Sequence, residues 1–266
     1  MDLLYRIPSG LLLAGAMAFA AAYGCGVQLV LRRRLKRVEA VPPAGAVFSA
    51  VNTLYAVVLG FLCVVVWQHY NETKERVWLE VSSVADTWHD AVGLRPAVRH
   101  EVRAEMLAYT RTVVDTEWAL MRTGGFSPRG DTLIMEATTQ VGTLVPANAG
   151  EASAQSAVLR LLADLHDARQ RRLAQSDTAI SGFEWTILIL GAMLVIAMCW
   201  LYDVGETRTD LLTTGGVAVL IAMMLVLIVE MQNPFRGAIA IGPDAWTAFL
   251  HHVESMDRGA MPAMKM

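Results

Sequence analysis

The sequence predicts an all-α integral membrane protein: four transmembrane helices in two hairpins, with a helical bundle outside the membrane inserted between the hairpins. Composition is the first observation behind this class, because 55% of the 266 residues are hydrophobic and 18% are charged, whereas a soluble domain has about 25% charged residues. The second is the presence of four apolar segments, each close to the roughly 20 residues that a spanning helix needs. These segments are residues 7–31, 46–67, 185–201 and 211–231.

The first apolar segment is expected to remain as an uncleaved helix. One basic side chain, Arg6, precedes it, and its apolar run is longer than the core of a cleaved signal peptide. Five of the six residues at 32–37 are basic, and because short basic loops stay in the cytoplasm, the charge rule places this linker there. Basic residues flank the apolar segments on the other side too, so the side on which the helical bundle lies is left open.

The second apolar segment has no charged side chain from Ala46 to Trp67, and a helix of this length rises about 33 Å, enough to cross a bilayer. Thr53, Val57 and Phe61 lie four residues apart and so form one stripe along this helix. Hydrocarbon penalises unpaired polar groups, and we expect the polar part of the helix to face protein or water. Apolar spacing beyond Trp67 predicts that the same helix continues out of the membrane for several turns.

The middle of the chain has a different composition. Residues 68–183 hold 12 Lys and Arg residues and 15 Asp and Glu residues, and their apolar spacing is that of helices. Within it, helices are expected at 98–121, 131–144 and 151–176. The predicted organisation is a first transmembrane hairpin, an extramembrane helical bundle, a second transmembrane hairpin, and a C-terminal segment with a flexible tail. The corresponding boundaries are residues 1–67, 68–183, 184–232 and 233–266.

Three short patterns carry a resemblance to a known family. They are Val58-Leu59-Gly60-Phe61, Glu117-Trp118, and Asn233-Pro234-Phe235-Arg236-Gly237 after the last apolar segment. On these patterns the chain resembles the bacterial bestrophin-like membrane proteins over most of its length, and it is distantly similar to the bestrophin anion channels. The resemblance implies a multi-pass protein of the bacterial cytoplasmic (inner) membrane. Bestrophins keep their termini and middle segment in the cytosol, which is opposite to the side that the charge rule gives here.

The resemblance also implies an assembly with a pore. In bestrophins five subunits bring the second transmembrane helix around a narrow apolar neck, so we expect a homopentamer in which Thr53, Val57 and Phe61 face the neck and Gly60 lets helices approach closely. The expected partners are the lipid bilayer, further copies of the chain and small, chloride-like anions, with no nucleic acid. The same stripe would also suit a helix-packing seam in a non-conducting protein, and both interpretations stay open.

Glu230 is a further candidate, because it follows an uncharged stretch at the end of the last apolar segment. It could be an interfacial carboxylate, the mouth of an ion pathway, or a lock onto Arg236 beside the Asn233-Pro234-Phe235 turn. Eukaryotic bestrophins follow this motif with acids that form a calcium clasp. Here no carboxylate occurs between Phe235 and Asp244, so calcium regulation is not expected.

Neither an enzyme nor a cofactor is expected. The sequence has no phosphate-binding loop, nucleophile elbow, HExxH or CxxC pattern. The C-terminal tail could bind a soft metal such as Cu(I) through imidazoles and thioethers, and its candidate residues are His251, His252, Glu254, Met256, Asp257, Met261, Met264 and Met266. We adopt a flexible terminus instead and predict no metal site.

The Glu117-Trp118 pair is expected to pack within the bundle, with the Trp118 ring buried and Glu117 paired to Arg111, to Arg122 or to a facing helix. Two functions follow from the whole pattern. The leading one is an oligomeric ion channel or pore lined by the second transmembrane helix. The alternative is a non-conducting membrane sensor or scaffold whose helical domain binds a ligand or partner.

Overall fold

The computed structural model describes residues 7–34, 42–175, 180–199 and 207–259, and these described ranges are helical, without a β-strand. The chain divides into two compact units. Unit 1 comprises Met1–Tyr70 and Thr178–Ala240, and unit 2 comprises Asn71–Asp177 and Ile241–Met266. Each unit has its own core, and α2 (Pro42–Asp90) contributes residues to both.

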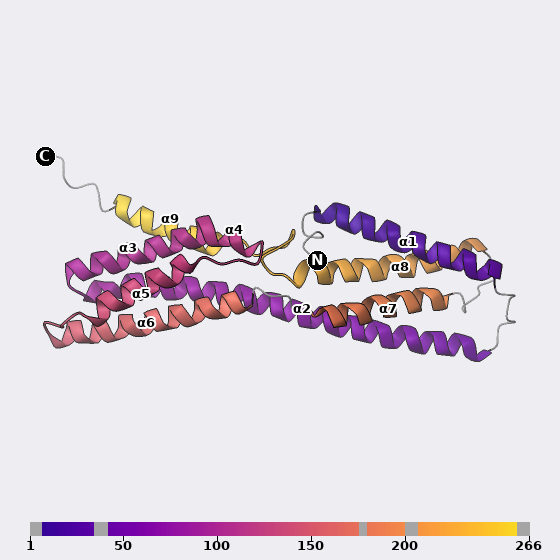
Figure 1. Ribbon diagram of the computed structural model, residues 1–266, viewed down its shortest axis with the longest axis horizontal. Coiled ribbons are helices and arrows are strands. Elements are labelled where there is room, and N and C mark those ends of the chain that lie inside the picture. Colours follow the sequence, from indigo (N-terminus) through magenta and orange to yellow (C-terminus); the bar gives the residue numbers. More distant parts are fainter. Residues whose placement is uncertain (1–6, 35–41, 176–179, 200–206, 260–266) are drawn as a thin grey trace. The chain divides into compact units, whose positions relative to one another are not determined.

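Unit 1 contains α1 (Ser9–Arg34), the first half of α2, α7 (Gly182–Met198) and α8 (Thr207–Met231). In Figure 1, α1 lies along α8, and α7 lies between α8 and α2. Small residues allow the first contact: a Cβ on Gly24 of α1 would lie 3.3 Å from Thr214 and 3.4 Å from Ala218 on α8. On the other side of α7, the Tyr55 hydroxyl donates a 3.1 Å hydrogen bond to the carbonyl of Leu188.

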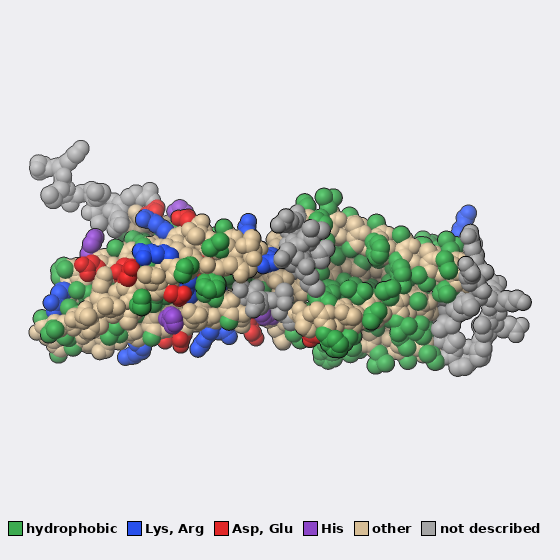
Figure 2. Space-filling view, in the orientation of Figure 1, with side chains coloured by type: hydrophobic (Ala, Val, Ile, Leu, Met, Phe, Trp, Pro, Cys, Tyr) green, Lys and Arg blue, Asp and Glu red, His purple; other side chains and the backbone are tan. Residues whose placement is uncertain are grey.

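Three helices of the described chain are long and apolar enough to cross a membrane, in the ranges Ser9–Leu31, Gly45–Gly93 and Thr207–Met231. The third of the four apolar segments forms α7, which has 17 residues and is shorter than these spans. Figure 2 shows hydrophobic side chains covering the visible face of unit 1. The chain is therefore an all-helical, multi-pass membrane protein, whereas the count of four spans and their layout as two hairpins stay predictions.

Local sequence signals explain where several helices begin. α7 starts with a capping box, in which the Ser181 hydroxyl accepts from the Glu184 amide and the Glu184 carboxylate accepts from the Ser181 amide at 2.7 Å. Ser127 caps α5 (Pro128–Gly142), and Asn148 caps α6 (Ala149–Ala174) through a 2.9 Å hydrogen bond from the Glu151 amide. These caps use backbone donors that a helix cannot satisfy by itself.

Unit 2 is a bundle of helices around α2. The sequence-based expectation that the second apolar helix continues past Trp67 is confirmed, because α2 runs without interruption to Asp90. The helices expected at 98–121, 131–144 and 151–176 are also present, with ends shifted by a few residues. The remaining elements of the unit are the turn η2 (Ala91–Gly93), α3 (Pro96–Thr112), the π-helical segment η3 (Val113–Glu117), α4 (Trp118–Met121) and α9 (Asp244–Gly259).

The C-terminal helix α9 packs onto this bundle. Trp246 on α9 is fully buried, and its ring centroid lies 5.9 Å from that of Tyr109 on α3. The predicted C-terminal segment therefore adds a helix to the core of unit 2 after the chain leaves α8. Residues 260–266, which include Met261, Met264 and Met266 of the predicted tail, lie outside the described residues, as do 35–37 of the basic linker.

Candidate functional site

The α2 stripe that was predicted to line a pore lies on the open surface of unit 1. Val57 is 50% exposed and Phe61 is 69% exposed, and a Cβ on Gly60 would meet nothing within 4 Å. Thr53 is exposed as well, and its hydroxyl donates a 2.8 Å hydrogen bond to the Ser49 carbonyl within the helix. Because this internal bond satisfies the hydroxyl, the stripe can face an apolar neighbour without an unpaired donor.

The opposite face of α2 packs inside unit 1. Leu59 and Val66 are buried in a cluster with Trp185 and Leu188 of α7 and Ile228 of α8. The helix therefore has two apolar faces. One face packs against α7 and α8 in the core of unit 1, and the other, which includes the stripe, is exposed on the surface of the unit.

Glu230 has a defined local role at the end of α8. Its carboxylate is buried and accepts a 2.8 Å hydrogen bond from the backbone amide of Ala238. The intervening chain turns at Gly237, whose φ of 87° lies in the left-handed region that favours glycine. Glu230 thus fastens the segment that follows α8 back onto the end of the helix.

The Asn233-Pro234-Phe235 turn is buried beside this contact, while Arg236 is half-buried. The Arg236 amide donates to the Asn233 carbonyl at 3.0 Å, which closes the turn. Two long side chains hold the flanking residues: the Trp185 indole donates to Gln232 at 2.8 Å, and the Tyr70 hydroxyl donates to the Ile239 carbonyl at 2.8 Å. The whole motif is a fixed part of unit 1 that ties α7, α8 and α2 together.

Unit 2 contains a buried ionic cluster, which we define as Glu80, Glu117, Arg169 and Arg172. None of these four side chains is exposed. Glu117 accepts hydrogen bonds from Arg169 at 2.6 Å and from Arg172 at 2.9 Å. Arg172 also makes a two-point contact with Glu80, through its Nε and through Nη2 at 3.0 Å. Two carboxylates and two guanidinium groups balance each other, which a buried cluster requires because an unpaired buried charge is strongly destabilising.

Neighbouring polar groups complete the cluster. The Tyr109 hydroxyl donates to Glu80, and Arg169 donates to the Ser127 carbonyl at 2.7 Å and to Asp131 at 3.0 Å. Gly130 lies against Arg169, and a Cβ there would come within 2.6 Å of the guanidinium carbon. Glycine at this position therefore makes room for the arginine.

The electrostatics of the cluster favour the charged forms of its acid–base pairs. Burial by itself would raise the pKa of Glu117, but the hydrogen bond from Arg169 and the positive charges of Arg172 and Arg169 outweigh it and lower the pKa. Burial opposes the charge on Arg172, yet Glu80 raises the pKa of that guanidinium further. Burial and the charge of Glu80 raise the pKa of Tyr109, which keeps its hydroxyl protonated as a donor. Glu117 and Arg172 therefore keep their charges at neutral pH, and Tyr109 stays a neutral hydrogen-bond donor.

The sequence-predicted pair Glu117-Trp118 lies at this cluster. Glu117 pairs with the facing helix α6, while Arg111 and Arg122 are exposed. Trp118 is 5% exposed, donates a 3.0 Å hydrogen bond to the Ile241 carbonyl, and stands next to the Arg172 guanidinium. The π-helical segment η3 ends at Glu117, at the point where its carboxylate enters the cluster.

Sequence reasoning missed the partners of Glu117, although a signal was present. The buried positions of α6 follow three- and four-residue spacing, and the two arginines continue the same stripe. These positions are Val158, Leu162, Leu165, Arg169 and Arg172. Glu80 likewise falls on the buried stripe of α2 between Val77 and Val84. Charged residues at core positions of two helices predict that they pair with each other.

A metal centre finds no support in the described residues, where no group of three or more His, Cys, Asp and Glu side chains could hold an ion. His251 and His252 are exposed on α9. Of the methionines that the Cu(I) alternative invoked, Met256 is exposed on α9, and Met261, Met264 and Met266 lie outside the described residues.

Comparisons with known proteins agree with this architecture. The family model of the bestrophin-like domain matches residues 15–246. A solved crystal structure, described as that of a membrane protein, superposes with a TM-score of 0.64 over 90% of this chain and 98% of that chain at 11% identity, which shows a shared fold. No curated protein matches the chain. Since the family model covers most of its length, the chain belongs to the bestrophin-like family.

Proposed function

We propose that the protein is an oligomeric ion channel or pore lined by α2, which passes small, chloride-like anions. The observation that carries this proposal is the two-sided character of α2, whose inner face packs in unit 1 while Thr53, Val57 and Phe61 stay on its open surface. Copies of this face brought together around one axis would form stacked rings of small polar, aliphatic and aromatic side chains. Such apolar rings can gate a narrow pore by dewetting.

Several features suit this function. Gly60 carries no neighbour that blocks the approach of another helix, and close helix packing in membranes depends on such small residues. The apolar part of α2 from Ala46 to Trp67 has no charged side chain of either sign. The anion is therefore proposed from the similarity to the bestrophin anion channels. The proposed assembly is a homopentamer in the bacterial cytoplasmic membrane, and the proposed activity is not enzymatic.

The test is ion flux through liposomes that contain the purified oligomer. Phe61→Ala removes the largest side chain of the stripe and is expected to change chloride flux severalfold, because it widens the narrowest apolar ring. Phe183→Ala is the matched control, since Phe183 is also an exposed phenylalanine, 74% accessible, but lies on α7. This control is expected to conduct as the wild type does.

Silent liposomes with an intact oligomer would overturn the channel proposal. Equal effects of Phe61→Ala and Phe183→Ala would overturn it too, because the α2 phenylalanine would then matter no more for conduction than an exposed phenylalanine elsewhere. Cysteines at Thr53 and at Phe61 offer an independent check, since neck-facing positions are expected to cross-link between copies while a cysteine at Phe183 does not.

The second candidate function is a non-conducting sensor or scaffold, and the buried ionic cluster favours it. Glu80 on α2 and Arg172 on α6 lie on the two helices through which the chain enters and leaves the main part of unit 2. A ligand or partner on unit 2 could act on both helices through this contact. For this function, removing residues 71–177 should abolish capture of a cross-linked partner in cells and leave membrane insertion unchanged.

A further inference from the structure

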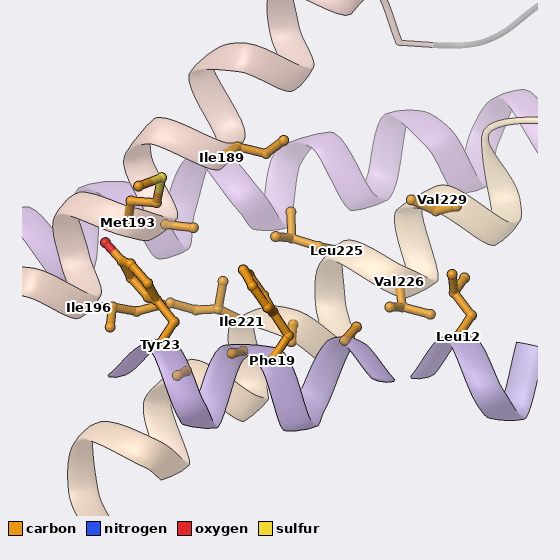
Figure 3. A pocket seen from close by; sticks show the side chains of 15 residues that line it. Leu12, Phe19, Tyr23, Ile189, Met193, Ile196, Ile221, Leu225, Val226 and Val229 are labelled. Carbon is orange, nitrogen blue, oxygen red and sulfur yellow. The ribbon is translucent and has the colours of Figure 1, made fainter. Parts of the chain in front are cut away.

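Three helices of unit 1 enclose a pocket that the proposed pore does not use. It has a volume of about 440 Å³ and lies between α1 and α7, with α8 as its floor. Figure 3 shows Phe19 and Tyr23 of α1 pointing into it, with Ile189 and Met193 of α7 on the other side. Ala218 and Ala222 leave space above α8 because their side chains are short.

The chemistry of this pocket selects an apolar occupant. The Tyr23 hydroxyl is the one polar side-chain group among the residues that line it. Water needs two to four hydrogen-bond partners to be held in a cavity, and these walls do not supply them. The lips of the pocket are exposed on the apolar surface of unit 1, with Phe19 75%, Ile189 47% and Met193 42% accessible. A surface of this kind faces lipid hydrocarbon in a membrane.

The length and volume of the pocket also bear on which apolar group could occupy it. The lining runs from Leu12 to Tyr23 on α1 and from Ala218 to Val229 on the antiparallel α8, which in both helices corresponds to about 16 Å of rise. This length is close to one leaflet, which is about 15 Å of hydrocarbon. A volume of about 440 Å³ along this length is that of a slender groove, which suits an extended apolar group such as a single hydrocarbon chain. A helix, in contrast, is about 10–12 Å across.

A second copy of the protein is a poor occupant of the pocket itself. Fifteen residues line the pocket, whereas a stable interface buries about 800 Å² and about 20–30 residues on each partner. A helix resting across the lips would leave the volume beneath it unfilled, and unfilled apolar volume is destabilising.

We propose that the pocket between α1, α7 and α8 binds one acyl chain of a bilayer phospholipid, as a lipid site separate from the α2 stripe. The chain lies along α8, with its methylene groups against Ala218, Ala222 and Leu225 and its flanks against α1 and α7. The bound chain fills the space between α1 and α7, which both pack on α8, and its methylene groups gain dispersion contacts with both helices. This inference does not depend on conduction.

The experiment is photolabelling of the purified, full-length oligomer in liposomes of phosphatidylglycerol and phosphatidylcholine that contain a phosphatidylcholine with a diazirine in its acyl chain. Labelled peptides are quantified by mass spectrometry. Labelling of residues 12–23 and 218–229 is divided by labelling at Leu190 of α7, which is exposed and belongs neither to the pocket nor to the α2 stripe. Ala16→Phe fills the pocket from α1, and Ala18→Phe adds the same ring two residues away at a position that does not line it.

In the wild type the residues of the pocket should be labelled more strongly than Leu190. Ala16→Phe is expected to lower the ratio about tenfold, because the added ring displaces the contacts of about two methylene groups, while Ala18→Phe leaves it unchanged. If Ala16→Phe fails to assemble, Ala222→Leu fills the same space from α8 with a smaller change. The proposal is overturned if the wild-type ratio is one, if both phenylalanine variants behave alike, or if cysteines at Phe19 and Met193 cross-link between copies.

Discussion

Replacing Arg172 by methionine tests how much the buried ionic cluster contributes to the stability of unit 2. Methionine keeps an unbranched, flexible apolar side chain in place of the arginine stem, so the variant removes the charge and its hydrogen bonds while part of the packing is kept. Glu80 would lose both guanidinium contacts and keep only the hydrogen bond from Tyr109, and Glu117 would keep only Arg169 and the Ser127 amide. Breaking a buried pair in this way costs about 3–5 kcal/mol, because it leaves a buried carboxylate without its counter-charge.

For a unit of about 130 residues, this cost corresponds to a fall in Tm of about 11–18 °C. The measurement is thermal unfolding of the detergent-purified protein followed by tryptophan fluorescence, since Trp118 and Trp246 are both buried in unit 2. Arg129→Met is the matched control, because the 3.3 Å pair of Arg129 with Glu136 is 55% and 43% exposed. An exposed pair contributes about 0–1 kcal/mol, so this variant should unfold within about 3 °C of the wild type.

A double variant separates charge from packing. Glu80→Gln combined with Arg172→Met removes one charge of each sign and is expected to recover part of the stability that Arg172→Met loses. If the single variant unfolds with the Arg129→Met control, or if the double variant is less stable than the sum of its single changes predicts, then the cluster does not stabilise unit 2 through paired charges.

Three further predictions concern unit 2 and the turn after α8. Burial and the charge of Glu136 raise the pKa of Glu105 to about 7, so the folded state holds this proton more tightly than the unfolded chain does. The contribution of Glu105 to the free energy of unfolding is fully present below a pH of about 4 and is lost as the pH rises through 7. Glu105→Gln should abolish that loss in a series of Tm measurements from about pH 5 to 8. Gly130→Ala would push its new methyl into Arg169 and should cost about 1–3 kcal/mol in chemical denaturation. Gly237→Ala strains a φ of 87° and should cost about 1 kcal/mol, whereas alanine at the exposed Gly182 should not.

Apolar length and helical spacing were enough to predict most of the fold. The runs around α1, α2 and α8 became helices of spanning length, and three- or four-residue spacing placed α3, α5 and α6. These signals depend on the neighbours of each residue within its own helix, and the sequence displays them directly. The glycine of η2 and the capping residues of α5 and α6 mark the ends in the same local way.

The candidate sites depend on contacts between helices, and these were harder to predict. Glu80 and Arg172 are 92 residues apart, and their pairing requires α2 and α6 to face each other in one register. Nothing near Glu117 indicated the π-helical segment that ends there, because a widened turn depends on packing more than on local composition. The open face of α2 was visible as a stripe, but its neighbours belong to other chains or to lipid, which a single sequence does not contain.

The separation of Glu80 from Arg172 also constrains how the protein is made. The ribosome adds about 5–20 residues each second, so Glu80 is added to the growing chain about 5–18 seconds before Arg172 is added. Throughout that interval the carboxylate has to remain in contact with water, because closing the bundle around it would leave it unpaired. The nascent bundle must therefore stay open until its last long helix has been synthesised, and during this time its apolar stripes are accessible to chaperones.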